Sequence, residues 1–155
     1  AALAKVVLPP HRSAMLAAGG RTILDDCYNA NPASMSAAIA TVVAAVGGAG
    51  GWARAFAVLG DMLEIGSESE ELHRALGREA GVRLAGVVSL GDFAGAIADG
   101  ARTAGLTAER ARVAQSPEEA AAVVAAWTAP GDWILVKASR GMRLERVVDA
   151  LQGGL

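Results

Sequence analysis

The chain has 155 residues, a length that fits one domain and leaves little room for two. Its 14 basic and 16 acidic side chains give a formal net charge of −2, which excludes the strongly basic surface that nucleic acids or anionic membranes require. No apolar run reaches the roughly 18 residues of a membrane span, so we expect no membrane insertion, and a single cysteine, Cys27, excludes an internal disulfide.

The first residues, 1–12, are expected to form an interdomain segment or the start of the domain. Their short apolar stretch is broken by Pro9-Pro10 and lacks the long apolar region and the cleavage site of a signal peptide. The domain itself is expected over residues 13–155.

Short apolar runs alternate with stretches of helical spacing along the rest of the chain. The expected strands are Thr22–Asp26, Ala53–Leu59, Gly86–Leu90, Ala111–Ala114 and Trp133–Lys137. This repeated alternation predicts an α/β, Rossmann-like three-layer domain. We expect a mostly parallel sheet of about five or six strands with helices on both faces.

Apolar residues at helical spacing predict the helices between and after these strands. The clearest stripes are Met35, Ile39, Val43 and Val46, then Ala120, Val123, Val124 and Trp127, and finally Leu144, Val147, Val148 and Leu151. Helix starts are expected at four places that carry capping residues. They are Asn31 with Pro32, Ser67 with Glu70 in a capping box, Asp92, and Ser116 with Pro117 and Glu119.

Polar residues of both charge signs follow the strands, and in an open α/β sheet ligands bind outside the carboxyl ends of the strands. After the first strand come Asp25, Asp26, Tyr28, Asn29 and Asn31; after later strands come Asp61, Asp92, Lys137, Ser139 and Arg140. Such an edge suits a zwitterion. We expect Asp61 to face an ammonium group, whereas Lys137, Arg140 and the N–H groups of the last helix face a carboxylate.

Simpler structural roles compete with these assignments. Asp25 and Asp26 are also explained as turn residues, Asn31 and Asp92 as helix caps, and Lys137 with Arg140 as a solvated helix entrance. His11 and His73 lack metal-ligand spacing and are expected to be structural or on the surface. Cys27 is expected to be a packing residue, and Arg143 and Arg146 are expected to face solvent.

Several catalytic motifs are missing from the sequence. No Gly-x-Gly-x-x-Gly follows the first strand, and no Gly-x-x-x-x-Gly-Lys-Ser/Thr occurs, since the glycine-rich loop Gly47–Gly51 precedes a strand and lacks the lysine. No Ser-His-Asp or Cys-His arrangement and no metal-ligand cluster is indicated. The residues alone therefore predict a ligand-binding α/β domain without catalytic residues or a metal site of its own.

Three of the segments at the strand ends resemble motifs in the C-terminal domain of the Mur ligase family. They are Asp25-Asp26-Cys27-Tyr28-Asn29-Ala30-Asn31-Pro32, Val58-Leu59-Gly60-Asp61-Met62-Leu63-Glu64-Ile65-Gly66, and Leu135-Val136-Lys137-Ala138-Ser139-Arg140-Gly141-Met142. Their form is most similar to that of family members that join D-alanyl-D-alanine to UDP-N-acetylmuramoyl-tripeptide in peptidoglycan synthesis. Cys27 and Ala138 depart from the family pattern, where serine and glycine are usual.

The resemblance implies a bacterial, cytoplasmic, ATP-dependent ligase of three domains. In this family ATP phosphorylates the terminal carboxylate of the peptide, and the amine of D-alanyl-D-alanine attacks the acyl phosphate. ATP and Mg²⁺ are bound mainly by a central domain that these 155 residues do not contain. Because the P-loop is absent from the chain, the resemblance implies that the chain is inactive alone.

The resemblance also implies roles for individual residues. Asp26 reaches the ATP ribose, Arg12 approaches the phosphates, and Tyr28 belongs to the same site. Asn29, Asn31, Lys137, Ser139 and Arg140 line the cleft, with the last three seating the dipeptide.

Two alternative interpretations stay open. One is the C-terminal domain of another Mur or folylpolyglutamate-type ligase, against which the pairing of Tyr28-Asn29-Ala30-Asn31 with Lys137-Ala138-Ser139-Arg140 argues. The other is a stand-alone α/β ligand-binding module, which a P-loop encoded upstream of Ala1 would exclude.

Overall fold

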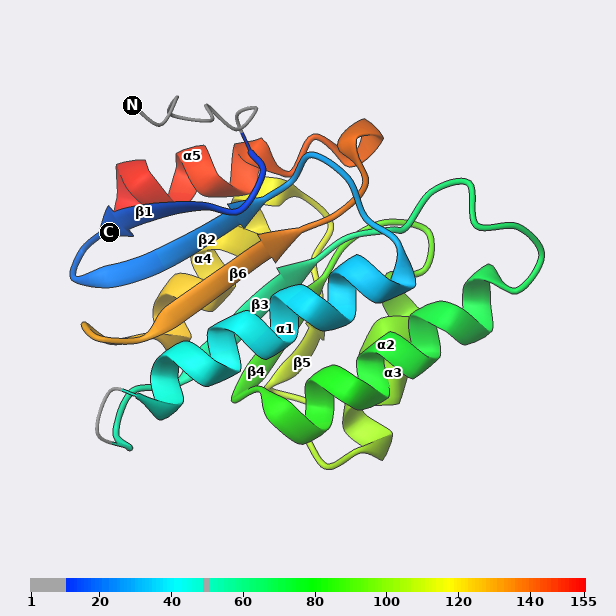
Figure 1. Ribbon diagram of the computed structural model, residues 1–155, viewed down its shortest axis with the longest axis horizontal. Coiled ribbons are helices and arrows are strands. Elements are labelled where there is room, and N and C mark those ends of the chain that lie inside the picture. Colours follow the sequence, from blue (N-terminus) through cyan, green and yellow to red (C-terminus); the bar gives the residue numbers. More distant parts are fainter. Residues whose placement is uncertain (1–10, 49–50) are drawn as a thin grey trace, which may run out of the picture.

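A six-stranded sheet separates two helical layers in the computed structural model, which describes residues 11–48 and 51–155 (Figure 1). The expected interdomain segment 1–12 therefore lies almost wholly outside the described residues. The strands are β1 (Ala14–Ala18), β2 (Arg21–Asp26), β3 (Ala55–Leu59), β4 (Gly86–Ser89), β5 (Ala111–Val113) and β6 (Trp133–Lys137). The helices are α1 (Pro32–Gly47), α2 (Ser69–Arg83), α3 (Ala94–Thr103), α4 (Pro117–Trp127) and α5 (Glu145–Gly154), with a 3₁₀ turn, η1 (Arg140–Met142).

The strand order is β1-β2-β6-β3-β4-β5, and all neighbours are parallel except β1 and β2. Helices α1, α2 and α3 cover one face, and α4 and α5 cover the other (Figure 1). Alternate residues of each central strand enter different cores: Phe56 and Val58 face α4 and α5, whereas Ala57 and Leu59 face the other three helices. Burial on both faces explains why the central strands are continuous apolar runs.

The five strands expected from the sequence are confirmed, and Trp133–Lys137 has the bounds that its apolar run predicts. Strand β1 is an addition, because its exposed Met15 and many alanines give a weak apolar signal. A local signal for it exists in Gly19-Gly20. These two residues have φ values of 54° and 77° and join β1 to β2 as a two-residue hairpin loop, a conformation that favours glycine.

Two of the four expected caps are confirmed. Asn31 caps α1, because its side-chain oxygen accepts a hydrogen bond from the Ser34 amide at 2.8 Å. Ser116 caps α4 in the same way, accepting from the Glu119 amide at 3.1 Å. Both caps satisfy backbone N–H groups that have no partner inside the helix.

The other two expected caps are wrong. Helix α2 begins at Ser69, and the residue at its N-cap position is Glu68, whose side chain makes no capping hydrogen bond, so Ser67 does not cap it. Helix α3 begins at Ala94 after Phe93, and the Asp92 side chain does not cap it either. A residue distant in sequence caps α3 instead, as described below.

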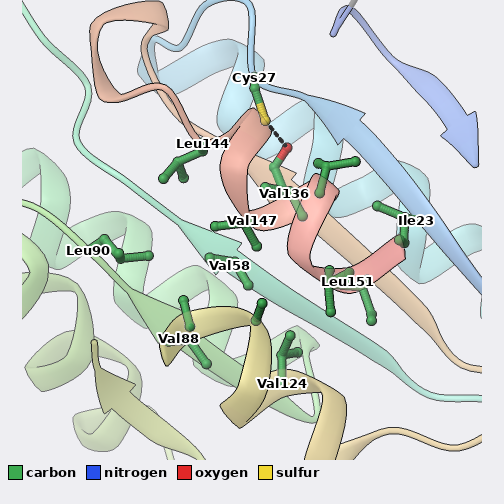
Figure 2. Packing of buried hydrophobic residues seen from close by; sticks show 14 of the residues in the cluster. Ile23, Cys27, Val58, Val88, Leu90, Val124, Val136, Leu144, Val147 and Leu151 are labelled. Atoms are coloured by element: carbon green, nitrogen blue, oxygen red, sulfur yellow. Dashed lines mark hydrogen bonds between the residues drawn. The ribbon is translucent and has the colours of Figure 1, made fainter. Parts of the chain in front are cut away.

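The apolar stripe expected for the last helix is confirmed. Leu144, Val147 and Leu151 are each no more than 1% exposed. They pack with Val58 and Val124 in the core between the sheet and helices α4 and α5 (Figure 2). This packing fixes the position of the segment between β6 and α5, which carries Arg140 and Arg143.

No helix in the described part of the chain is long and apolar enough to span a bilayer.

Candidate functional site

The centre of the candidate site is a buried ion pair between the ends of two neighbouring strands. Asp26 ends β2 and Lys137 ends β6, and the two residues are paired across the parallel strands. The Lys137 Nζ donates to Asp26 Oδ2 at 2.6 Å and to the Asn29 carbonyl at 2.8 Å. The Lys137 side chain is 2% exposed, so its ammonium group is committed to these two partners and holds the loop after β2 against β6.

The second carboxylate oxygen of Asp26 is tied to the segment before β1. Its Oδ1 accepts from the Ser13 amide at 3.0 Å and from the Ser13 hydroxyl at 3.5 Å. The neighbouring Arg12 guanidinium lies 4.4 Å from the centre of the Tyr28 ring, a cation–π contact. The segment before β1 therefore contacts the end of β2 through Ser13 and Asp26, and it contacts the loop after β2 through Arg12 and Tyr28.

These residues surround a hollow of about 260 Å³, which we call the Asp26 hollow. Its lining is Arg12, Ser13, Asp26, Tyr28, Asn29, Asn31, Ser34 and Lys137. Six of the nine site residues expected from the sequence thus come together. Ser13 and Ser34 were not expected there; Ser34 belongs to the capping arrangement of Asn31, and Ser13 has no local signal, because it enters through the pairing of β1 with β2.

Asp61 lies apart from this hollow and has a structural role. Its side chain is buried, and its two oxygens accept from the backbone amides of Asp92 at 2.8 Å and Phe93 at 3.0 Å. Asp61 therefore provides the cap of α3 that was expected from Asp92. Both oxygens already accept from backbone N–H groups, and the expectation that this carboxylate faces an ammonium group of a ligand stays a prediction.

Ser139 also lies behind the site and connects three loops. Its hydroxyl accepts from the Leu63 amide at 2.8 Å and donates to the Ala30 carbonyl at 3.5 Å, and its own amide donates to the Asp61 carbonyl at 3.0 Å. The side chain is buried. Ser139 thus holds the loops after β2, β3 and β6 together.

Arg140 is separated from Lys137 by the direction of its side chain. Its guanidinium lies 5.3 Å from the centre of the Tyr28 ring. It lines a second hollow, of about 340 Å³, with His11, Cys27, Arg143 and Glu145. Lys137 and Arg140 therefore line different hollows, and the expectation that both pair with one carboxylate does not fit the structure.

The amides of the last helix are also partly occupied. The Arg146 amide donates to the Arg143 carbonyl at 3.2 Å, and the Val147 amide donates to the Leu144 carbonyl at 2.9 Å. These two amides are therefore not free for a ligand, and the expectation that the free N–H groups of this helix face a carboxylate stays a prediction.

His11 is the main polar residue that the sequence did not place at the site. Its Nδ1 lies 2.6 Å from Asp25 Oδ2, and Asp25 is buried. No local pattern predicts this pair, because the two residues are 14 positions apart and meet through the antiparallel pairing of β1 with β2.

The structural interpretations of His73 and Cys27 are confirmed. His73 is fully buried; its Nε2 accepts from the Met62 amide at 2.9 Å, and its Nδ1 donates to the Ser69 carbonyl. The Cys27 thiol donates to the Val136 carbonyl at 3.5 Å (Figure 2). Burial, followed by the charge of Asp25, raises the pKa of Cys27, so it stays an unreactive thiol.

A metal site is a separate question. Within residues 11–48 and 51–155, no group of three or more His, Cys, Asp and Glu side chains is placed to hold a metal ion.

Comparisons with known proteins give consistent matches. A family model described as "Mur ligase, glutamate ligase domain" matches residues 11–140. The UDP-N-acetylmuramoyl-tripeptide–D-alanyl-D-alanine ligase of Mycobacterium tuberculosis is 36% identical over 97% of this chain and 33% of its own length. The ligase of the same name from Bacillus subtilis is 36% identical over 85% of this chain and 28% of its own length. The chain thus spans about a third of the length of these relatives.

Solved structures agree with the sequence matches. The MurF ligase of Thermotoga maritima, in complex with ADP, superposes with a TM-score of 0.77 at 30% identity and covers 97% of this chain and 32% of its own. A MurF structure from Acinetobacter baumannii superposes with a TM-score of 0.76 at 27% identity over 92% of this chain and 30% of its own.

Proposed function

Because the chain belongs to the Mur ligase family, we propose that its residues 13–155 are the C-terminal domain of an ATP-dependent ligase. The ligase adds D-alanyl-D-alanine to UDP-N-acetylmuramoyl-tripeptide, the reaction that the relatives' names state. Since the chain spans about a third of those relatives, the proposal concerns a protein of their full length.

The observation that carries the proposal is the Asp26 hollow, which we propose as part of the nucleotide site. The Asp26 carboxylate is held by Lys137 and by the backbone of Ser13, and it is 13% exposed. A carboxylate has about four lone-pair sites, so Asp26 can accept a further hydrogen bond from a ribose hydroxyl. The exposed Arg12 beside it supplies a positive charge for the phosphates. A relative with the same fold was solved in complex with ADP, which supports a nucleotide as a ligand of the full-length protein.

When bound, ATP supplies the phosphoryl group that activates the acceptor carboxylate for attack by the dipeptide amine. The residues of this chain help to bind ATP and the dipeptide and to position them. Lys137 fixes both the Asp26 carboxylate and the Asn29 carbonyl before a ligand arrives, so less ordering is needed on binding. We propose, from the resemblance to the family, that Mg²⁺ is bound mainly by a central domain outside these 155 residues.

For the dipeptide, the available side chains differ from the set that the motifs imply. Lys137 and Ser139 are buried and bonded within the protein, so we assign them to holding the loops. Arg140, Asn29 and Asn31 are exposed and remain the candidates for contact with the dipeptide.

The test uses the complete gene product that contains this chain. We expect ADP release that requires both UDP-N-acetylmuramoyl-tripeptide and D-alanyl-D-alanine, and we expect the 155-residue chain alone to release none. Asp26→Asn should raise the KM for ATP about tenfold or more, because a charge-assisted hydrogen bond is lost. Asp149→Asn, an exposed change on α5, is the control.

Two outcomes would contradict this proposal. ADP release that depends on a different amino acid would assign the chain to another ligase. A gene product without a P-loop that binds the dipeptide but never consumes ATP would make the chain a binding module.

A further inference from the structure

The outer edge of strand β1 is a feature that the proposed function does not use. β1 ends the sheet on one side, and no strand within residues 11–48 and 51–155 pairs with its outer edge (Figure 1). We propose that this edge pairs antiparallel with β1 of a second copy of the chain, so that two six-stranded sheets join into one. Such association is independent of the ligase assignment.

The backbone of β1 offers hydrogen-bonding groups along this edge. The Thr22 amide donates to the Asp132 carbonyl at 3.1 Å, on the β6 side of β2 and away from β1. Thr22 lies opposite Ala17, and in an antiparallel ladder the two residues of such a pair both point their N–H and C=O groups away from each other. The same holds two residues along, where Met15 lies opposite Leu24. The N–H and C=O groups of Met15 and Ala17 therefore point outward from the sheet.

The two edges of the sheet differ in their protection against such pairing. Edge strands of monomeric proteins are commonly very short, charged or interrupted by proline. The opposite edge, β5, has three residues and carries the exposed Arg112. β1 has five residues, and the stretch from Ser13 to Gly20 contains no charged residue and no proline. β1 is therefore the edge that is open to another strand.

The side chains of β1 complement a second copy of themselves. In an antiparallel pair centred on Leu16, Met15 lies opposite Ala17 of the second copy, and these two residues exchange their outward hydrogen bonds. Met15 is 68% exposed, and the small Ala17 of the second copy leaves room for it. The two Met15 side chains then lie diagonally on one face, within reach of each other, beside a groove of about 430 Å³ lined by Leu24 and Ala38. The same strand thus supplies both the large and the small side chain of the match.

Analytical ultracentrifugation and amide hydrogen exchange of the 155-residue chain test this pairing. The contact is small and belongs to the transient class of interfaces, so we expect a dissociation constant on the order of 100 µM. The chain should sediment as a monomer at about 20 µM and chiefly as a dimer at about 1 mM. Over this range the amides of Met15 and Ala17 should gain protection from exchange, whereas those of Leu16 and Ala18, which face β2, should change little.

Two results with the wild type would refute the proposal. One is a chain that stays monomeric at the highest concentration. The other is protection of the Met15 and Ala17 amides already at the lowest concentration, because another part of the same chain would then cover the edge.

Met15→Lys and Val82→Lys are matched variants. Both replace an exposed apolar side chain, 68% and 75% exposed, and add one positive charge, but Val82 lies on α2. Met15→Lys should raise the dissociation constant about tenfold or more, because two ammonium groups then lie close together across the pair. Val82→Lys should leave it unchanged. Equal dissociation constants for the two variants would place the interface away from β1 and overturn the proposal.

Ala17→Pro tests the backbone pairing separately. It removes an outward N–H that β2 does not use, and proline is tolerated on edge strands at such positions. The circular dichroism spectrum should be retained and the dimer lost. A folded Ala17→Pro variant that dimerises like the wild type would contradict strand pairing, and if this variant does not fold, the two lysine variants decide. Because association needs neither ATP nor the dipeptide, a failure here is distinct from a failure of the ligase assay.

Discussion

Replacing Lys137 by methionine tests whether the buried ion pair holds the Asp26 hollow together. Methionine keeps most of the length of the side chain but leaves Asp26 without the ammonium group at 2.6 Å. Removing one partner of a buried pair typically costs about 3–5 kcal/mol. Asp26 is 13% exposed and keeps the Ser13 amide, so we expect the lower end, about 3 kcal/mol. For a chain of this size that lowers the Tm by about 6–12 °C.

Urea unfolding of four proteins measures the interaction: the wild type, Lys137→Met, Asp26→Asn and the double variant. If the ammonium and carboxylate act on each other, the double variant should be more stable than the sum of the single losses, by about 1.5 kcal/mol or more. Arg146→Met is the control, since it breaks an exposed pair with Glu118 and should cost less than about 0.5 kcal/mol.

Two results would refute this reasoning. One is additive losses in the cycle, and the other is a Lys137→Met variant that is as stable as Arg146→Met. In the complete enzyme, Lys137→Met should raise the KM for ATP, as Asp26→Asn does. A rise confined to the KM for D-alanyl-D-alanine would instead favour a direct contact of Lys137 with the dipeptide.

Three further predictions concern the buried supports of the fold. Asp61→Asn should lower the free energy of unfolding by about 1–3 kcal/mol in urea, since one of two backbone N–H groups loses its acceptor; Asp92→Asn should change it by less than about 0.5 kcal/mol. The Cys27 thiol should resist iodoacetamide at pH 8 until the protein unfolds. Because burial raises its pKa in the folded state, its stabilising contribution should fall as the pH rises above the ordinary thiol value of 9.0. Gly77→Ala should destabilise the fold strongly, because an added Cβ would clash with the backbone of α3. Gly95→Ala adds a Cβ that meets nothing within 4 Å, so it should stabilise the helix by about 0.5–1 kcal/mol. Thermal unfolding of the two variants checks both expectations.

Local sequence signals were sufficient to predict a strand or a helix cap where the interacting groups lie within one element or within a few positions of each other. The run Trp133–Lys137 is a strand because its residues are buried on both faces. Asn31 and Ser116 cap their own helices through amides only three positions away. The cap of α3 could not be found in this way, because Asp61 lies 31 positions before the amide that it accepts from.

The sequence shows which polar residues follow the strands. Because parallel strands end at the same edge of a sheet, it also predicts that these residues lie along one edge. Which of them face a ligand depends on the strand order. Because β6 lies between β2 and β3, Lys137 lies opposite Asp26, 111 positions away, and is neutralised there. Because β1 turns back along β2, His11 meets Asp25 and lines a hollow with Arg140. The sequence by itself determined the residue types and the edge, whereas only the tertiary structure decided which charges are paired internally and which remain open to a ligand.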